Sequence, residues 1–135
     1  MVLEFAECCC PIPGDPIVGL MRSGTGVEVH RESCAQVLQL PQQDIPVMSL
    51  RWAENYYGEY IVRIVLSLLH EAGALARISL SIADLNANIE DFQVVGRNSN
   101  FYTVSMHIAV RDRAHLARII ASLHKSSVVH RVQRD

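Results

Sequence analysis

Residues 60–69 read YIVRIVLSLL, and this stretch decides the fold of the C-terminal half of the chain. Its even-numbered positions are all apolar, whereas Arg63 and Ser67 occupy odd-numbered positions. Because successive side chains of a strand point to opposite faces of a sheet, the alternation predicts a strand with one buried face. Residues 70–73 (HEAG) then break the pattern and indicate a turn.

The segments after this strand show helical and extended patterns in turn. Residues 74–87 carry apolar side chains at helical spacing, which predicts a helix with one buried stripe. Residues 88–95 and 101–110 predict two strands of a hairpin. Asp112 is placed to cap a second helix, and residues 127–134 predict a closing strand. The apolar face of the second helix consists of Leu116, Ile119, Ile120 and Leu123.

The order of these elements is βαββαβ, which predicts an α+β domain over residues 59–135. Each helix has one apolar stripe to bury, so we expect both helices on one face of a four-stranded antiparallel sheet, as in a ferredoxin-like fold. Such a sheet leaves its strand edges exposed, so we expect this domain to form a homodimer. Its open face is expected to carry Arg63, Thr103, Ser105 and His107.

The segment before this domain is short and rich in turns. Residues 17–21 and 27–30 predict a hairpin, and residues 35–38 predict a brief helix, so residues 1–38 are interpreted as a small ββα module. So few apolar residues do not form an independent core, and we expect a metal, a cross-link or a partner surface to stabilise the module. We interpret residues 39–58, which contain two prolines, as a linker with a possible short strand, because the run VMSLRWA at residues 47–53 alternates.

Composition excludes several classes of protein. Half of the 135 residues are hydrophobic, which is enough for a folded core. No run of 18 uninterrupted apolar residues is present, and the N-terminus does not have the layout of a secretory signal, so we expect a cytoplasmic protein without a membrane partner. Disulfides rarely persist in the cytoplasm, so the four cysteines indicate metal or thiol chemistry.

Three cysteines are adjacent in the sequence, and the fourth follows a histidine. His30 and Cys34 are separated by three residues, at the place where a ββα zinc module has its second ligand pair, and Cys8 and Cys9 would be the first pair. A disulfide between adjacent cysteines is strained, which disfavours that interpretation. Buried, reduced thiols around a small core are the alternative to a zinc site. No residues combine as a nucleophile with its base, so no catalytic residue is predicted.

Basic residues gather in the last third of the chain. Residues 97–134 contain seven of them against the single Asp112: Arg97, Arg111, Arg113, Arg118, Lys125, Arg131 and Arg134. Arginine suits bidentate phosphate contacts. Scattered surface arginines without a ligand are the alternative interpretation.

Residues 8–34, CCCPIPGDPIVGLMRSGTGVEVHRESC, resemble the zinc-finger or conserved-cysteine module of the RelA/SpoT family, whose enzymes make and degrade guanosine tetraphosphate. The family pattern Cys-Cys-x-Pro-x-Pro-Gly-Asp-x-Ile, followed by Gly-x-Gly-Val-x-Val-His-x-x-x-Cys, is met along the whole stretch. The resemblance implies that Cys8, Cys9, His30 and Cys34 are the zinc ligands. Cys10 departs from the family pattern, and it could replace Cys9 as the partner of Cys8, because alternate strand residues share a face.

Residues 109–134, AVRDRAHLARIIASLHKSSVVHRVQR, are similar to the closing helix and strand of the ACT domain that follows the zinc-finger module in this family, and they are closest to its SpoT-like, bifunctional branch. The synthetase and hydrolase domains of the family have no counterpart in the chain. The resemblance therefore implies a C-terminal regulatory part of a GTP pyrophosphokinase or (p)ppGpp hydrolase, without catalytic activity of its own.

The resemblance leaves two functions open. The first is a regulatory arm that contacts ribosomal RNA, senses uncharged tRNA and relays the starvation signal to the catalytic half of the parent enzyme. Arg111, Arg113 and Arg118 support it, because they cluster at the start of a predicted helix, where the backbone dipole also favours phosphate.

The second function is an amino-acid sensor, since ACT domains often bind amino acids at the first strand–helix turn. Here Gly73 would let the backbone approach a ligand, and the amides of Ala74 and Leu75 would bind its carboxylate. An acceptor for the ammonium group is not evident, since His70 and Glu71 fit loosely. The alternative is that Gly73 merely ends the turn and begins the helix.

Overall fold

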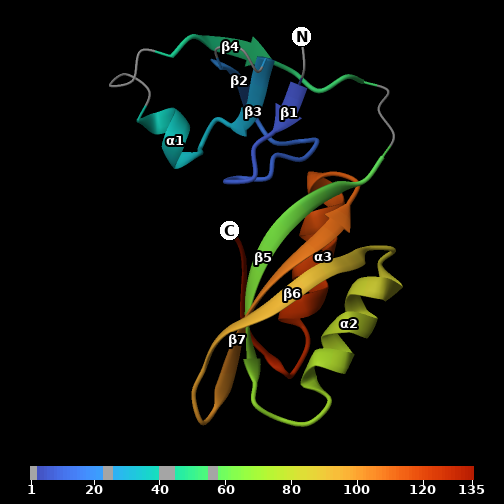
Figure 1. Cartoon of the computed structure of the whole chain (residues 1–135). Coiled ribbons are helices and arrows are strands. Elements are labelled where there is room, and N and C mark those ends of the chain that lie inside the picture. The colour runs from blue at the N-terminus through green and yellow to red at the C-terminus, as the bar shows by residue number, and fades with distance from the viewer. Residues whose placement is uncertain (1–2, 23–25, 40–44, 55–57) are drawn as a thin grey trace. The chain divides into compact units, whose positions relative to one another are not determined.

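The computed structural model of the chain describes residues 3–22, 26–39, 45–54 and 58–135. Its contacts divide the chain into an N-terminal unit, Met1–Gly58, and a C-terminal unit, Glu59–Asp135 (Figure 1). The predicted hairpin turn and parts of the predicted linker lie outside the described residues.

In the C-terminal unit, all of whose residues are described, the chain forms one four-stranded sheet and two helices (Figure 1). The strands lie in the order β6-β7-β5-β8, and neighbouring strands are antiparallel. This arrangement confirms the predicted ferredoxin-like fold. Its elements are β5 (Tyr60–Leu69), α2 (Ala74–Asp84), β6 (Asn88–Arg97), β7 (Phe101–Val110), α3 (Arg113–His124) and β8 (Val129–Arg134).

The core of this unit lies on one face of the sheet, as the alternation in β5 predicts. The even-numbered residues Val62, Ile64, Leu66 and Leu68 are at most 1% exposed. Both helices pack on the sheet and on each other. They bury apolar residues at helical spacing, which are Ile78 and Ile82 in α2 and Leu116, Ile119 and Leu123 in α3.

The other face of the sheet carries polar side chains, and several of them contact one another. Arg63 donates from Nε to Ser105 Oγ at 2.9 Å, and its Nη1 lies 2.9 Å from Asp135 Oδ2. His107 Nδ1 lies 2.7 Å from Asp91 Oδ1. Both His107 and Ser105 belong to the expected open face, which is therefore present and internally hydrogen-bonded.

The described residues of the N-terminal unit form a second four-stranded sheet, with strand order β1-β3-β2-β4. The predicted hairpin and short helix are present, and two strands join them. One is β1, which pairs in parallel with β3, and the other is β4, which pairs with β2. The elements are β1 (Leu3–Phe5), β2 (Ile17–Arg22), β3 (Gly26–Arg31), α1 (Ala35–Leu38) and β4 (Val47–Leu50).

The possible short strand of the predicted linker is thus present, since residues 47–50 form a strand that pairs with β2 in the first sheet. Gly19 permits this pairing, because a Cβ at this position would lie 2.7 Å from Val27 Cγ1 and 2.9 Å from Leu50 Cδ1. The unit also has a small apolar core, whose side chains are at most 6% exposed: Ile12, Ile17, Leu20, Val27 and Val29. The ββα module is therefore larger and better packed than the sequence indicates.

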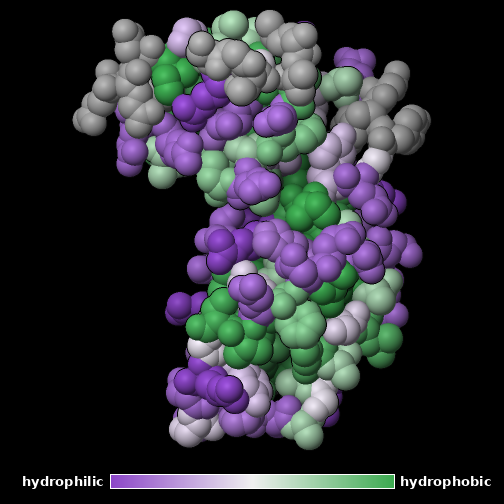
Figure 2. Space-filling view, viewed as in Figure 1, coloured by the Kyte–Doolittle hydropathy of each residue, from purple (hydrophilic) through white to green (hydrophobic). Residues whose placement is uncertain are grey.

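Hydrophobic side chains also reach the surface of the C-terminal unit. Figure 2 shows them in the region where Figure 1 draws β6 and α2. Phe92, Val94 and Val95 of the edge strand β6 are about half exposed, at 47%, 50% and 54%. Among the described residues, no helix is long and apolar enough to cross a membrane.

Candidate metal centre

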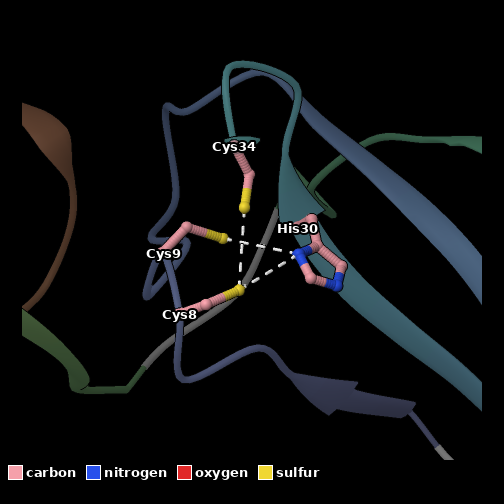
Figure 3. Close-up of side chains that lie close together, drawn as sticks. All are labelled: Cys8, Cys9, His30 and Cys34. Carbon is pink, nitrogen blue, oxygen red and sulfur yellow. Dashed lines mark hydrogen bonds between the residues drawn. The ribbon is translucent and has the colours of Figure 1, made fainter. Parts of the chain in front are cut away.

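Three separate segments of the N-terminal unit bring one histidine and three cysteines together. Cys8 and Cys9 lie in the turn after β1, His30 lies near the end of β3, and Cys34 immediately precedes α1. Their side chains point toward one another in Figure 3. Because β1 pairs with β3, the turn that follows β1 is held beside His30.

The ligand atoms of these four residues all lie within 4.8 Å of one another. Cys8 Sγ lies 3.6 Å from Cys34 Sγ and 3.5 Å from His30 Nδ1, and Cys9 Sγ lies 3.7 Å from the same nitrogen. A tetrahedral centre with Zn–S bonds of about 2.3 Å would place its sulfur atoms about 3.8 Å apart. The donor set and its spacing therefore fit a tetrahedral metal ion such as Zn²⁺.

Cys10 lies outside this group of four. Its Sγ donates to the backbone carbonyl of Glu7 at 3.5 Å, and its φ of 46° is a left-handed conformation. Strand alternation would place Cys10 on the same face as Cys8 and so make it a competitor of Cys9. Residues 7–9 form a turn, however, and the alternation of a strand does not apply to them.

The backbone also supports Cys9. The N–H of Arg31 donates to Cys9 Sγ at 3.4 Å, and the N–H of Cys10 donates to the carbonyl of Ala6 at 3.0 Å, which closes the turn. Cys9 and Cys34 are 3% and 8% exposed. A thiolate at Cys9 would be stabilised by the Arg31 N–H, which is an arrangement that suits a metal ligand.

The pKa values of the three thiols differ. Burial, together with the neighbouring thiols, raises the pKa of Cys8 to about 12. Burial likewise raises the pKa of Cys9 above its ordinary value. Burial acts in the same direction on Cys34, but hydrogen bonds, among them one from the backbone of Gln36, outweigh it and lower the pKa of Cys34 to about 7. A bound cation would displace the remaining protons and stabilise all three thiolates.

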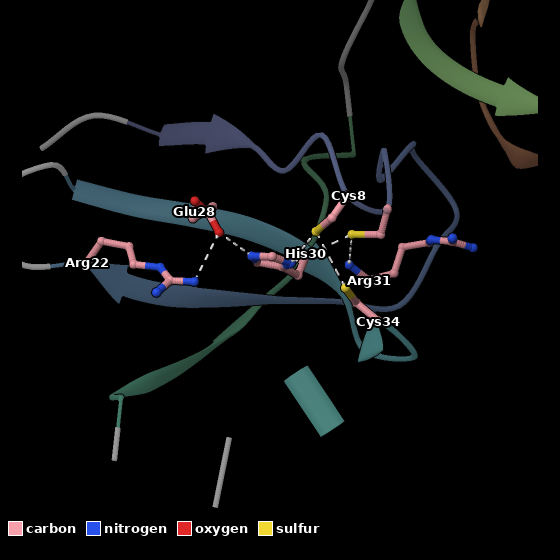
Figure 4. A network of polar contacts seen from close by, with 7 residues as sticks. Cys8, Arg22, Glu28, His30, Arg31 and Cys34 are labelled. Atoms are coloured by element: carbon pink, nitrogen blue, oxygen red, sulfur yellow. Dashed lines mark hydrogen bonds and ion pairs between the residues drawn. The ribbon is translucent and has the colours of Figure 1, made fainter. Parts of the chain in front are cut away.

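One residue beside this cluster, Glu28, is not among the predicted site residues. Glu28 Oε1 contacts His30 Nε2, on the side of the ring opposite the sulfur atoms, and Arg22 Nη2 lies 3.5 Å from the same oxygen (Figure 4). Glu28 and His30 are two residues apart in β3, so their side chains share a face of the strand. That spacing is the signal in the sequence that could have revealed the contact.

The three arginines expected to bind RNA lie around the start of α3 in the C-terminal unit, and their side chains are exposed: Arg111, Arg113 and Arg118. The N-terminal end of α3 is capped by Asp112, whose Oδ1 accepts a hydrogen bond from the N–H of His115 at 2.7 Å. The backbone N–H of Arg111 donates to His115 Nδ1 at 3.0 Å. The arginine side chains therefore provide the positive charge of this surface, and the amide of His115 is not free to bind a phosphate.

The predicted amino-acid site borders a cavity of 520 Å³ in the C-terminal unit. Gly73 precedes α2 with φ of 80°, and no described atom lies within 4 Å of a Cβ placed on it. The glycine is thus required by its backbone conformation, which begins the helix, while the space beside it stays open. The cavity is lined by Leu68, Glu71, Gly73, Ala74, Leu75, Ala76, Val94, Arg97, Tyr102 and Val104.

Two charged side chains, one acidic and one basic, belong to this lining. Glu71 lies in the turn before α2, and Arg97 lies at the end of β6. Arg97 is a residue that the sequence analysis did not connect with Gly73. Glu71 Oε1 lies 3.6 Å from Arg77 Nη1, and this ion pair places the carboxylate near the start of α2.

Comparison with known proteins gives the same two-part division of the chain. A family model described as the RelA/SpoT RIS domain matches residues 1–53, and a model described as an ACT domain matches residues 57–134. The ACT domain of a GTP pyrophosphokinase from Chlorobium tepidum, a solved structure, is similar at a TM-score of 0.50 with 19% identity. The match covers 58% of this chain and 100% of the chain in the solved structure.

Curated relatives match along the whole chain. The bifunctional (p)ppGpp synthase/hydrolase SpoT of Escherichia coli is 30% identical over 135 residues, which are 100% of this chain and 19% of that protein. The bifunctional (p)ppGpp synthase/hydrolase RelA of Mycobacterium tuberculosis is 27% identical over 134 residues, 99% of this chain and 18% of that protein. The chain thus spans about one fifth of the length of these relatives.

Proposed function

Because the chain belongs to the RelA/SpoT family, as a C-terminal regulatory region with a RIS domain and an ACT domain, we propose that it contacts ribosomal RNA and relays a starvation signal. The recipient would be the catalytic half of a (p)ppGpp synthase/hydrolase, and uncharged tRNA would be sensed in that full-length context. The chain matches only the regulatory part of its relatives, so synthesis and hydrolysis are assigned to the parent enzyme. A cytoplasmic location, where ribosomes are found, is part of the proposal.

The observation that carries the RNA contact is the exposed arginine cluster at the start of α3. Guanidinium groups bind phosphate oxygens in a bidentate manner, and contact through the backbone needs no aromatic side chains to stack bases. The surface would therefore recognise the shape and charge of folded RNA without reading its sequence.

The test is to measure binding of the chain to ribosomes over a series of salt concentrations. Reversing Arg111, Arg113 and Arg118 to Glu should weaken binding, and the slope of log Kd against log salt should fall by about 0.7 to 0.9 for each phosphate that the variant no longer binds. Arg51→Glu, an exposed arginine of the N-terminal unit, is the matched control and should bind like the wild type. Binding that does not depend on salt, or that survives the triple reversal, would reject the RNA contact.

Within this region we assign a structural Zn²⁺ to Cys8, Cys9, His30 and Cys34. The ion would link the turn after β1, the end of β3 and the start of α1 through one centre. Its role would be structural, since four protein ligands fill a tetrahedral site and leave no open position for a substrate. Zinc content of protein purified without added metal tests this assignment, and protein that is folded and free of zinc would reject it.

An amino-acid sensor is the second candidate function, and the cavity beside Gly73 favours it. A carboxylate could bind Arg97 or the amides that open α2, an ammonium group could bind Glu71, and an aliphatic side chain could pack on Leu68, Val94 and Val104. This would provide the acidic partner that the sequence alone left unassigned.

The sensor is tested by the melting temperature of the chain with and without branched-chain amino acids. Glu71→Gln should abolish a ligand-induced shift by removing the partner of the ammonium group. Asp91→Gln, which removes a carboxylate elsewhere in the same unit, is the control. A shift that persists in Glu71→Gln would exclude this mode of binding, and the absence of any shift would leave the RNA-contacting arm as the function of this unit.

A further inference from the structure

The two ring nitrogens of His30 face different partners. Nδ1 lies 3.5 Å from Cys8 Sγ and 3.7 Å from Cys9 Sγ, whereas Nε2 contacts Glu28 Oε1 on the opposite side of the ring (Figures 3 and 4). A neutral imidazole has one N–H and one free lone pair, and a metal ion binds only the lone pair. Which nitrogen carries the proton therefore decides whether His30 can bind a metal on the side of the cysteines.

The environment of His30 favours one of these two states. The residue is fully buried, at 0% exposure, so an N–H on Nε2 needs an acceptor within the protein. An ionised carboxylate can only accept hydrogen bonds, so Glu28 is a suitable partner for Nε2–H and an unsuitable one for a bare nitrogen. The contact therefore keeps the proton on Nε2 and leaves the lone pair of Nδ1 directed toward the sulfur atoms.

Glu28 is in turn held in place by the sheet. Glu28 lies opposite Leu20 in the β2–β3 register, and Arg22 follows Leu20 by two residues on β2. The side chains of Leu20, Arg22 and Glu28 therefore share one face of the sheet. Arg22 Nη2 lies 3.5 Å from the same Oε1 that contacts His30. The side chains of Arg22 and Glu28 are 37% and 30% exposed, so solvent weakens their attraction, and the pair acts mainly by orienting the carboxylate.

We propose that Glu28 is a positioning residue of the metal centre, which fixes His30 in the tautomer that presents Nδ1 to the metal, and that Arg22 orients Glu28. The proposal rests on the proposed zinc site. It assigns Arg22, Glu28 and His30 to one chain of contacts that begins at the surface and ends at the metal. Outer partners of this kind typically change metal affinity by about 10- to 100-fold when they are removed.

The experiment uses the full chain and compares zinc affinities in competition with a chelating dye. Glu28→Met has a similar length and only a weakly accepting, uncharged thioether, and it should weaken zinc binding by about 10- to 100-fold. Glu28→Gln keeps an oxygen that accepts from Nε2–H, so it should recover part of this loss. Glu4→Gln, which removes the same charge at the register partner of Glu28 on β1, is the control and should bind zinc like the wild type.

The tautomer is read independently from long-range ¹H–¹⁵N spectra of the His30 ring in the wild-type protein. With zinc bound, the spectra should show a protonated Nε2 and a metal-bound Nδ1. Zinc on Nε2, or equal zinc affinity of Glu28→Met and wild type, would overturn the proposal. If Glu28→Met does not fold, the spectra of the metal-free wild-type chain decide: a proton on Nε2 before zinc is added supports the role of Glu28, and a proton on Nδ1 overturns it.

Failure of the zinc site itself gives a different result from failure of this proposal. If the wild-type chain binds no zinc, the structural metal is rejected. The spectra of the metal-free protein then show whether Glu28 still holds the proton on Nε2, and a proton on Nδ1 would overturn the role of Glu28 as well. If the chain binds zinc through the four ligands and Glu28→Met has no effect, the metal site stands and the positioning role is rejected.

Discussion

Cys8 Sγ and Cys34 Sγ lie 3.6 Å apart, although the two residues are 26 positions apart in the sequence. The distance is long for a disulfide and matches the edge of a tetrahedral zinc–thiolate centre. The contact joins the turn after β1 to the start of α1. A metal ion bound by both thiolates would therefore cross-link the two ends of the ββα module.

Removal of zinc should destabilise the N-terminal unit selectively. Trp52 is the single tryptophan of the chain, and its Nε1 donates to the carbonyl of Asp15 at 3.0 Å while its ring stacks on Phe5. Its fluorescence therefore reports on the N-terminal unit. A strong chelator should lower the melting temperature measured by Trp52 fluorescence. The reason is that zinc at about 1,000 times its Kd stabilises the folded state by about 4 kcal/mol.

The C-terminal unit provides the internal control for this prediction. Its backbone amides, followed by hydrogen exchange, should keep their protection after chelation, since its core lies between its own sheet and helices. A Trp52 transition that is unchanged by the chelator would contradict a structural metal.

Replacing single cysteines should separate the two possible ligand pairs. Cys9→Ser should lower the zinc content well below one ion per chain, because a serine hydroxyl is a poor zinc ligand. Cys10→Ser should retain one zinc ion, because Cys10 lies outside the group of four and donates to the carbonyl of Glu7. Elemental analysis of both purified variants is the measurement, and loss of zinc from Cys10→Ser alone would shift the pair to Cys8 and Cys10.

Zinc affinity should rise with pH, and its slope follows from the thiol pKa values. Burial raises the pKa of Cys8 to about 12 and raises that of Cys9, so both thiols hold their protons near pH 8 in the metal-free protein. The pKa of Cys34 is lowered to about 7 by hydrogen bonds that outweigh its burial, so this thiol has already lost its proton there.

Binding of zinc near pH 8 should therefore release about two protons, and the logarithm of the affinity should rise by about two for each pH unit. Competition titrations at pH 7.5, 8.0 and 8.5 measure the slope. A slope near zero would show that the thiols are already ionised and would contradict these pKa values.

Gly73→Ala should destabilise the C-terminal unit through its backbone. The φ of 80° costs a residue with a Cβ about 1 to 2 kcal/mol, while the space around the new atom is open. The melting temperature of this unit should fall by about 4 to 8 °C for each kcal/mol. Gly96→Ala is the control, because its new Cβ would make an ordinary 3.8 Å contact with Thr103. Equal stability of the two variants would contradict a conformational role for Gly73.

The edge strand β6 should support a homodimer of the chain. It is ten residues long, lies at the end of the sheet and exposes Phe92, Val94 and Val95. An open edge with apolar side chains favours pairing with a second copy. Sedimentation equilibrium should show self-association that Val94→Lys weakens, with Val47→Lys on β4 of the N-terminal unit as the control. A wild-type monomer at high concentration would exclude this interface.

The fold of the C-terminal unit can be predicted from the sequence alone, because its signals are local. Each strand and helix carries its own apolar period, as in residues 60–69, and Asp112 caps α3 as its position predicts. With one apolar stripe on each helix, few packing arrangements remain, and the observed one follows. The four metal-ligand candidates were likewise indicated by their types and spacing, and the structure brings them together.

Tertiary structure decided the features that depend on segments far apart in the chain. The pairing of β1 with β3 and of β4 with β2 rests on backbone hydrogen bonds, which have no pattern in the sequence. The turn at residues 7–9 places Cys9 Sγ within the group of four and leaves Cys10 outside it, an arrangement that strand alternation could not predict.

The contact of Glu28 with His30, and the meeting of Glu71 with Arg97 around one cavity, also required the fold. In each case a short-range pattern fixes which face a side chain occupies, but only the packing of whole elements decides which side chain lies opposite it.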